Sequence, residues 1–215
     1  MDLYLFNRSK FDELYRCDFY SVEDVTLDER QHVLMGSIAL ALFTIFEILY
    51  IPCVVAIYRN LHLPCYKFML FIGITDLCVL WVAGFFTGYF AITGAVYCSH
   101  PTLIYIAGIA AKMFWNMEST LTVILALNRC MDIIWPSMAE RLFSVERSWI
   151  WIGVAVIYGL CFAFFGKPVL YTAIYMSWFF YAHVGYSHLH EEEVISTMLI
   201  TLKYLFLEHI CFCNF

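Results

Sequence analysis

Long apolar stretches alternate with short polar segments along this chain. Five of the stretches are long enough to cross a membrane as α-helices, because the hydrocarbon core of a bilayer is about 30 Å thick and a helix rises about 1.5 Å per residue. They cover residues 32–58, 68–92, 102–127, 149–170 and 194–215. The pattern predicts an all-α fold, a polytopic transmembrane helix bundle of about five spans. Residues 1–31 form a polar tail and residues 32–215 the membrane domain.

The composition supports lipid, not water, as the solvent of this surface. Hydrophobic residues make up 63% of the chain and charged residues 14%, whereas an ordinary soluble domain carries about 25% charged residues. The net charge of −6 argues against a nucleic-acid-binding face, which needs clustered Lys and Arg. We therefore expect the lipid bilayer, and no nucleic acid, among the partners.

The short loops predict which side of the membrane each segment faces, since Lys and Arg are retained in the cytoplasm. Segments 59–67 and 128–148 contain basic residues, whereas segment 93–101 contains none. We expect the two basic loops inside, the N-terminus and segment 171–193 outside, and the plasma membrane as the location.

The segments expected outside contain a candidate glycosylation site and two cysteines. Asn7 opens an Asn-Arg-Ser sequon in the tail and is a candidate glycosylation site. Cys17 and Cys98 both lie outside in this topology, where disulfides persist. Most of the other cysteines fall in or beside apolar runs, where cysteine behaves as a small hydrophobe. No zinc-type CxxC pair occurs in the sequence.

Charged residues within the predicted spans need a partner, a cavity or a function, because each costs about 2.5–3.5 kcal/mol on insertion scales. Glu47 and Asp76 are expected at similar depth, since the first two spans are antiparallel, and a shared proton or cation lowers their cost. Asn116 and Ser119 of the third span are candidate neutral partners of Asp76. Two interpretations stay open for these four residues: an interior network that orders the bundle, or an ion or ligand site.

A candidate ligand cavity lies nearer the outside, with Lys112, Glu118 and Trp178 as its residues. Lys112 is placed to meet an anionic ligand group, to reach the interface, or to pair with Glu118. Trp178 belongs to an aromatic run that indicates an interfacial belt or a ligand lid. The exterior histidines lack a tetrahedral ligand pattern and are expected to be solvated, so we expect no metal and no cofactor; they are His183, His188 and His190.

The inner end of the third span carries the most specific motif. It reads Asn128-Arg129-Cys130, and Pro136 follows seven residues after the arginine. The motif resembles that of rhodopsin-like receptors, in which the third helix ends in an acidic residue, arginine and tyrosine, with a proline seven residues later. Further landmarks of that superfamily have counterparts at Asp76, Cys98 and Trp151.

Two departures from that pattern have consequences. Asn128 stands where those receptors have the acid and Cys130 where they have tyrosine, so an ionic latch on Arg129 is not expected. Cys98 has no cysteine partner in the second exterior loop. The resemblance therefore implies Cys17 as its exterior disulfide partner.

More specifically, the chain resembles the nematode serpentine receptor class T family of chemoreceptor-like proteins. This resemblance implies a seven-helix receptor that senses a small molecule and signals through a heterotrimeric G protein, with Asn128 and Cys130 as family features. It rests on Glu47-Ile48-Leu49-Tyr50-Ile51-Pro52, Cys65-Tyr66-Lys67, Gly88-Tyr89, Tyr97-Cys98-Ser99-His100-Pro101, Ala126-Leu127-Asn128-Arg129-Cys130 and Trp178-Phe179-Phe180.

Other functions remain as alternatives. No sixth or seventh apolar stretch follows residue 215, so we expect a C-terminally truncated form, which leaves a non-signalling or accessory membrane protein as one alternative. A transporter or ion pathway built on the intramembrane charges predicts inverted repeats, and none is visible. An enzyme needs a nucleophile, acid and base or metal ligands at one depth, and we do not expect one.

Overall fold

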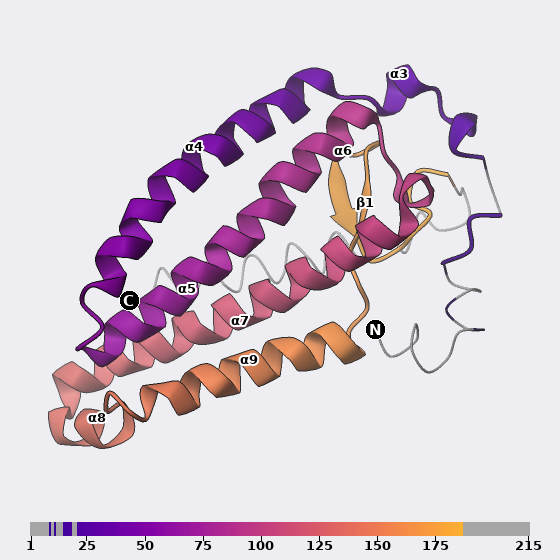
Figure 1. Cartoon of the computed structure of the whole chain (residues 1–215). Helices are drawn as coiled ribbons and strands as arrows, with labels where there is room; N and C mark the ends of the chain where they lie inside the picture. Colours follow the sequence, from indigo (N-terminus) through magenta and orange to yellow (C-terminus); the bar gives the residue numbers. More distant parts are fainter. Residues whose placement is uncertain (1–8, 10, 12–14, 19–20, 187–215) are drawn as a thin grey trace.

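The computed structural model describes residues 9, 11, 15–18 and 21–186 of the chain. Helices packed side by side dominate this part, as predicted (Figure 1). The elements are η1 (Val22–Asp24), α3 (Leu27–Arg30), α4 (Val33–Tyr58), α5 (Pro64–Leu80), η2 (Trp81–Phe86), α6 (Thr87–Thr93), η3 (Tyr97–Ser99), α7 (Pro101–Ile134), α8 (Pro136–Leu142), α9 (Ser148–Phe165), β1 (Leu170–Thr172) and β2 (Ser177–Phe179). The expected span 194–215 and residues Asn7, His188 and His190 lie outside the described residues.

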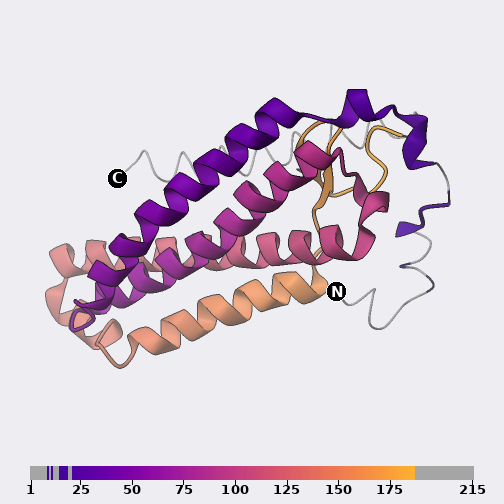
Figure 2. The ribbon, with the colours of Figure 1, turned by 45° about the horizontal axis from the view of Figure 1, so that its top comes forward.

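Three helical stretches of the described part are long and apolar enough to cross a membrane. They are Leu27–Tyr58, Pro64–Thr93 and Ser148–Phe165. The most apolar window of the first has no buried residue within the protein, as expected for a helix whose solvent is lipid. The expected third span lies within α7, which has 34 residues and also carries Lys112, Glu118 and Arg129. Across the bundle the order is α4, α5 with α6, α7 and α9 (Figures 1 and 2).

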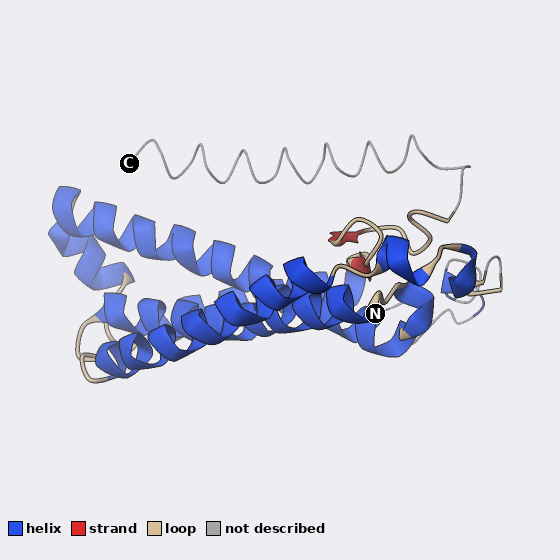
Figure 3. Ribbon diagram, turned by 90° about the horizontal axis from the view of Figure 1, so that it is seen from above, coloured by secondary structure: helices blue, strands red, loops and turns tan. Residues whose placement is uncertain are grey.

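The fourth span is shorter than the 149–170 that hydrophobicity predicted. Helix α9 ends at Phe165, and Gly166 has extended backbone angles. Pro168 lacks an N–H and disfavours helical geometry in the residue before it, so the helix does not continue. The apolar residues that follow enter a hairpin instead, in which β1 pairs antiparallel with β2 and Tyr171 faces Trp178. Figure 3 shows the two strands at one end of the bundle.

The second membrane helix changes its winding in the middle. Between α5 and α6 the backbone forms a π-helical turn, η2, a rare geometry that is frequent at functional sites. On its inner side α5 packs mainly against α7, whereas α6 packs mainly against α4. The α4–α6 contact requires glycine on both helices, because a Cβ at Gly36 would lie 2.7 Å from the Gly88 carbonyl oxygen and one at Gly88 would lie 2.9 Å from that of Gly36.

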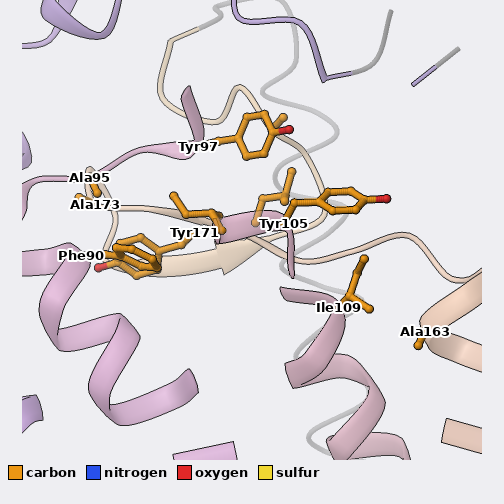
Figure 4. Packing of buried hydrophobic residues seen from close by; sticks show 11 residues of the cluster. Phe90, Ala95, Tyr97, Tyr105, Ile109, Ala163, Tyr171 and Ala173 are labelled. Atoms are coloured by element: carbon orange, nitrogen blue, oxygen red, sulfur yellow. The ribbon is translucent and has the colours of Figure 1, made fainter. Parts of the chain in front are cut away.

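A buried aromatic core at the hairpin end of the bundle joins the hairpin to the helices (Figure 4). Tyr171 is fully buried, and its ring centroid lies 5.4 Å from those of Phe90 and Trp178. The Ala173 N–H donates to the Ala95 carbonyl at 3.0 Å. The hairpin of β1 and β2 is therefore a packed part of the fold.

Candidate functional site

A cavity of about 280 Å³ lies between α4, α5 and α7 within the membrane domain. Asp76 and Glu118 bring two carboxylates to it from α5 and α7, and Tyr50 brings a phenol from α4. The remaining lining is apolar: Phe46, Val79 and Leu80. The cavity is thus an open and largely apolar space with three polar groups on its wall.

Asp76 is bonded to a residue that the sequence analysis did not select. The Tyr50 hydroxyl donates to an Asp76 carboxylate oxygen. Tyrosine counts as apolar in a hydrophobicity pattern, which hid it inside the first span. Its position three residues after Glu47, on the same helix face, was the available signal. Glu47 is half-buried, and its Oε2 atom has no hydrogen-bond partner in the described part of the chain.

Of the two expected partners of Asp76 on α7, Asn116 makes a contact within its own helix. The Asn116 side chain donates to the Lys112 carbonyl of its own helix at 2.7 Å. Ser119 is half-buried on the same helix. Glu118, which was placed in the outer ligand cavity, instead lines the inner one with Asp76.

Lys112 and Trp178 lie at the outer end, apart from Glu118. Six helical positions place Lys112 about 9 Å further out than Glu118 and on another face. The Lys112 ammonium donates to the Lys167 carbonyl at 2.9 Å, just beyond the end of α9. It also lies 5.2 Å from the ring centroid of Phe180 and 5.8 Å from that of Phe162. The predicted three-residue cavity is therefore two separate places.

Trp178 fastens the hairpin to the π-helical turn. Its indole N–H donates to the Thr87 hydroxyl at 3.0 Å. Thr87 in turn donates to the Val82 carbonyl at 3.1 Å, within the segment where the helical bonding is wider than normal. Trp178 thus acts as an anchor of the loop on the second helix, and Thr87 is a contact that the sequence analysis missed.

The motif residues Asn128, Arg129 and Cys130 at the C-terminal end of α7 differ in how exposed they are. Arg129 is exposed and makes no ion pair within the described part of the chain. Asn128 is only 2% exposed, and its Oδ1 atom has no hydrogen-bond partner among the described residues. Cys130 is half-buried, and Pro136 is the first residue of α8. The guanidinium is therefore accessible at the α8 end of the bundle.

The N-terminal tail is attached to the outer end of α7. Cys17 forms a disulfide with Cys98. Phe11 and Tyr15 pack on Tyr105, with centroid distances of 5.3 and 5.6 Å. Burial, followed by the effect of Tyr105, raises the pKa of the Tyr15 phenol to about 12. The described part of the tail is thus integrated into the outer core.

The histidine expected to be solvated within the described loop is buried. His183 is 6% exposed, and its ring lies 5.4 Å from that of Tyr181. His183 is buried because the loop folds onto the bundle, and the polar residues of that loop gave no sign of this packing. Among residues 9, 11, 15–18 and 21–186, no three His, Cys, Asp or Glu side chains are grouped to hold a metal ion.

Comparison with known proteins places this architecture in a family. Residues 1–213 match the family of serpentine type seven-transmembrane G-protein-coupled chemoreceptors, Srt. The chain belongs to the Srt family. One relative, serpentine receptor class T-55 of Caenorhabditis elegans, is 29% identical over 116 residues, which are 54% of this chain and 31% of the relative. The matched part of this Srt chain thus spans about a third of that relative's length, and the predicted family and multi-pass membrane fold are confirmed.

Proposed function

We propose that this Srt chain is the sensing and coupling part of a chemosensory receptor, which responds to a small molecule outside and acts on a heterotrimeric G protein inside. The observation that carries the proposal is Arg129 at the inner end of α7. Its guanidinium is exposed and without an ion pair in the described part, and its neighbour Asn128 has no charge to restrain it. A rigid fork of five N–H donors in that state suits recognition of carbonyls and carboxylates on a protein partner.

The proposed orientation has the N-terminus outside and the α8 end inside, with the plasma membrane as the location. The basic residues of the α4–α5 and α7–α9 connections support it, since such residues favour the cytoplasm. The disulfide of Cys17 with Cys98 at the opposite end also supports it, because disulfides persist outside the cell. An epitope tag at the N-terminus, detected on intact cells, tests the orientation, and a tag seen only after permeabilisation would reverse it.

Two places in the described part suit a small molecule. The proposed outer one lies around Lys112, whose ammonium is 5.2 Å from the ring centroid of Phe180, and a cation beside an aromatic ring suits a ligand with an acidic group. The inner one is the cavity with Asp76 and Glu118, which suits a cation or a basic group. In either place a ligand would contact α7, the helix that ends at Arg129, so a shift of α7 is the proposed route from ligand to partner.

The test compares two arginines of the inner side. The chain in lipid nanodiscs is mixed with nucleotide-free heterotrimeric G protein, and the dissociation constant is measured for the wild type, Arg129→Ala and Arg59→Ala. Loss of a central charged contact is expected to weaken binding about tenfold or more, whereas Arg59→Ala, which removes the same charge from the exposed end of α4, leaves it near the wild-type value. Equal binding by all three proteins would remove the basis of the coupling proposal.

The carboxylates around the inner cavity favour one second candidate, a cation pathway through the bundle. Asp76 and Glu118 lie on one cavity within the membrane domain, and intramembrane acids often mark ion routes. Uptake of protons or sodium by liposomes containing the chain, lost in Asp76→Asn, would support this candidate. Liposomes that stay impermeable would exclude it.

A further inference from the structure

Lys67 at the start of α5 is a buried cation whose contacts the sequence did not predict. Only 9% of its surface is exposed. Its ammonium donates to the Val145 carbonyl at 2.6 Å, in the segment between α8 and α9, and lies 5.1 Å from the ring centroid of Trp149. Burying an ammonium is unfavourable unless hydrogen bonds and ring contacts compensate for the lost water. The Lys67 side chain is thus bound to the loop between α8 and α9.

Aromatic rings on both sides surround this contact. Phe68, the next residue, is fully buried and meets Phe143 edge to face with centroids 6.3 Å apart. Phe71, one turn further, meets Trp149 in the same way at 5.6 Å. Phe143 also stacks on Trp151 at 5.6 Å. The segment after α8 is therefore attached to α5 by one ring pair and one charged hydrogen bond, and the start of α9 is attached to α5 by the second ring pair.

The attachment determines how α8 is presented. Helix α8 is joined to α7 through Trp135 on one side and to this attached segment on the other. The surface around it is apolar and open: Ile133 is 83% exposed, Trp135 62% and Met138 48%. Because α8 is short, its own hydrogen bonds do not fix its direction. The Trp151 indole N–H donates to the Leu142 carbonyl at the end of α8 at 3.1 Å, and the contact between Lys67 and the Val145 carbonyl adds a constraint from α5.

We propose that Lys67 is a positioning residue: by holding the Val145 carbonyl it sets the orientation of α8 and its apolar surface beside Arg129, and so controls binding of the intracellular partner. The inference rests on the proposed coupling function, but the loop geometry can be tested without it. Lysine is suited to the task because its long stem reaches the loop while its charge makes the bond strong.

The first measurement is amide hydrogen exchange of the chain in nanodiscs, followed by mass spectrometry of segment 136–147. Lys67→Met removes the donor and is expected to speed exchange in this segment about tenfold, whereas Lys67→Arg restores slow exchange. Arg59→Met is the matched control, because it removes one exposed cation from the same inner loop. Unchanged exchange in Lys67→Met, or an equal effect of Arg59→Met, would overturn the proposal.

The second measurement is the dissociation constant for nucleotide-free G protein with the same variants. Weaker binding by Lys67→Met, with recovery in Lys67→Arg, supports the positioning role. A loosened loop with unchanged binding overturns that role and leaves the coupling function standing. If the wild type binds no G protein, the coupling function fails, and with it the role of Lys67 in partner binding, while the exchange data still decide whether Lys67 fixes the loop. Should Lys67→Met fail to fold, Trp149→Leu is expected to loosen the same amides.

Discussion

Tyr50 of α4 donates its hydroxyl to the carboxylate of Asp76 on α5, which joins two membrane helices through a polar contact. A carboxylate at this depth needs a donor, because lipid offers none. Glu118 of α7 reaches the same cavity, so three helices share one polar centre. The contact therefore contributes to the packing of the bundle, whatever else binds there.

Replacing Tyr50 by phenylalanine is expected to destabilise the bundle. Tyr50→Phe keeps the ring and removes the hydroxyl, so Asp76 loses its donor at a cost of about 1–2 kcal/mol. Thermal unfolding in detergent, followed by circular dichroism, should show a lower midpoint. Tyr58→Phe, at the exposed end of α4, should show none. Equal midpoints for both variants and the wild type would mean that the contact adds no stability.

Gly108 of α7 is expected to tolerate no side chain. A Cβ there would overlap the Val169 carbonyl oxygen of the segment before β1. Backbone cannot move aside as a side chain does, so Gly108→Ala is expected to cost about 3 kcal/mol and to displace the hairpin. Gly153→Ala in α9, where nothing lies within 4 Å of the new Cβ, is expected to stabilise the helix by about 0.5 kcal/mol. Similar unfolding midpoints for these two alanine variants would contradict the packing of α7 on the hairpin.

Loss of the disulfide is expected to release the tail from the outer end of α7. The bond links positions 81 residues apart, and removing such a link typically costs about 2–5 kcal/mol. Cys17→Ser and Cys98→Ser should lower the unfolding midpoint equally, and the double variant should add nothing. Cys161→Ser, at a free exposed cysteine, is the control. Additive effects of the two single changes would show that they act separately.

Alkaline pH is expected to weaken the tail contact through Tyr15. Its pKa of about 12 in the folded protein exceeds the ordinary value of about 10. The unfolded chain therefore loses this proton first, so the contribution to stability is complete below pH 10 and is lost as the pH rises through 12. Unfolding free energies measured between pH 9 and about 12 should fall less in Tyr15→Phe than in the wild type. Tyr175→Phe, at an exposed tyrosine of the hairpin, should follow the wild type.

The helices were predictable because lipid imposes the same requirement on every residue of a span. The ends of the helices were harder to predict, because an apolar run indicates burial or lipid contact but not helical geometry. Leu170 belongs to the predicted fourth span, yet it is buried in β1. Pro168 carried the local signal for that end.

The contacts of the candidate site depended on which helix faces meet, and one sequence contains little of that information. Three roles stayed open for Lys112, namely a ligand contact, the interface or a pair with Glu118. Its bond to the Lys167 carbonyl, which forms because α9 ends beside it, was not predicted. The contacts of Tyr50 and Lys67 were not predicted for the same reason, because their partners come from other elements. Asp76 and Arg129 were selected from charge and motif alone, and their roles stay predictions.

The π-helical turn η2 divides the second membrane helix into two parts with different angular phase. A wider turn adds about one residue to the winding, which rotates everything beyond it by about 100° relative to a regular helix. Phe90 and Ala91 face the protein core in the observed phase. Insertions or deletions between residues 81 and 86 would thus rotate α6 alone. The residues that α6 turns toward its neighbours can then change while α5 keeps its register with α7.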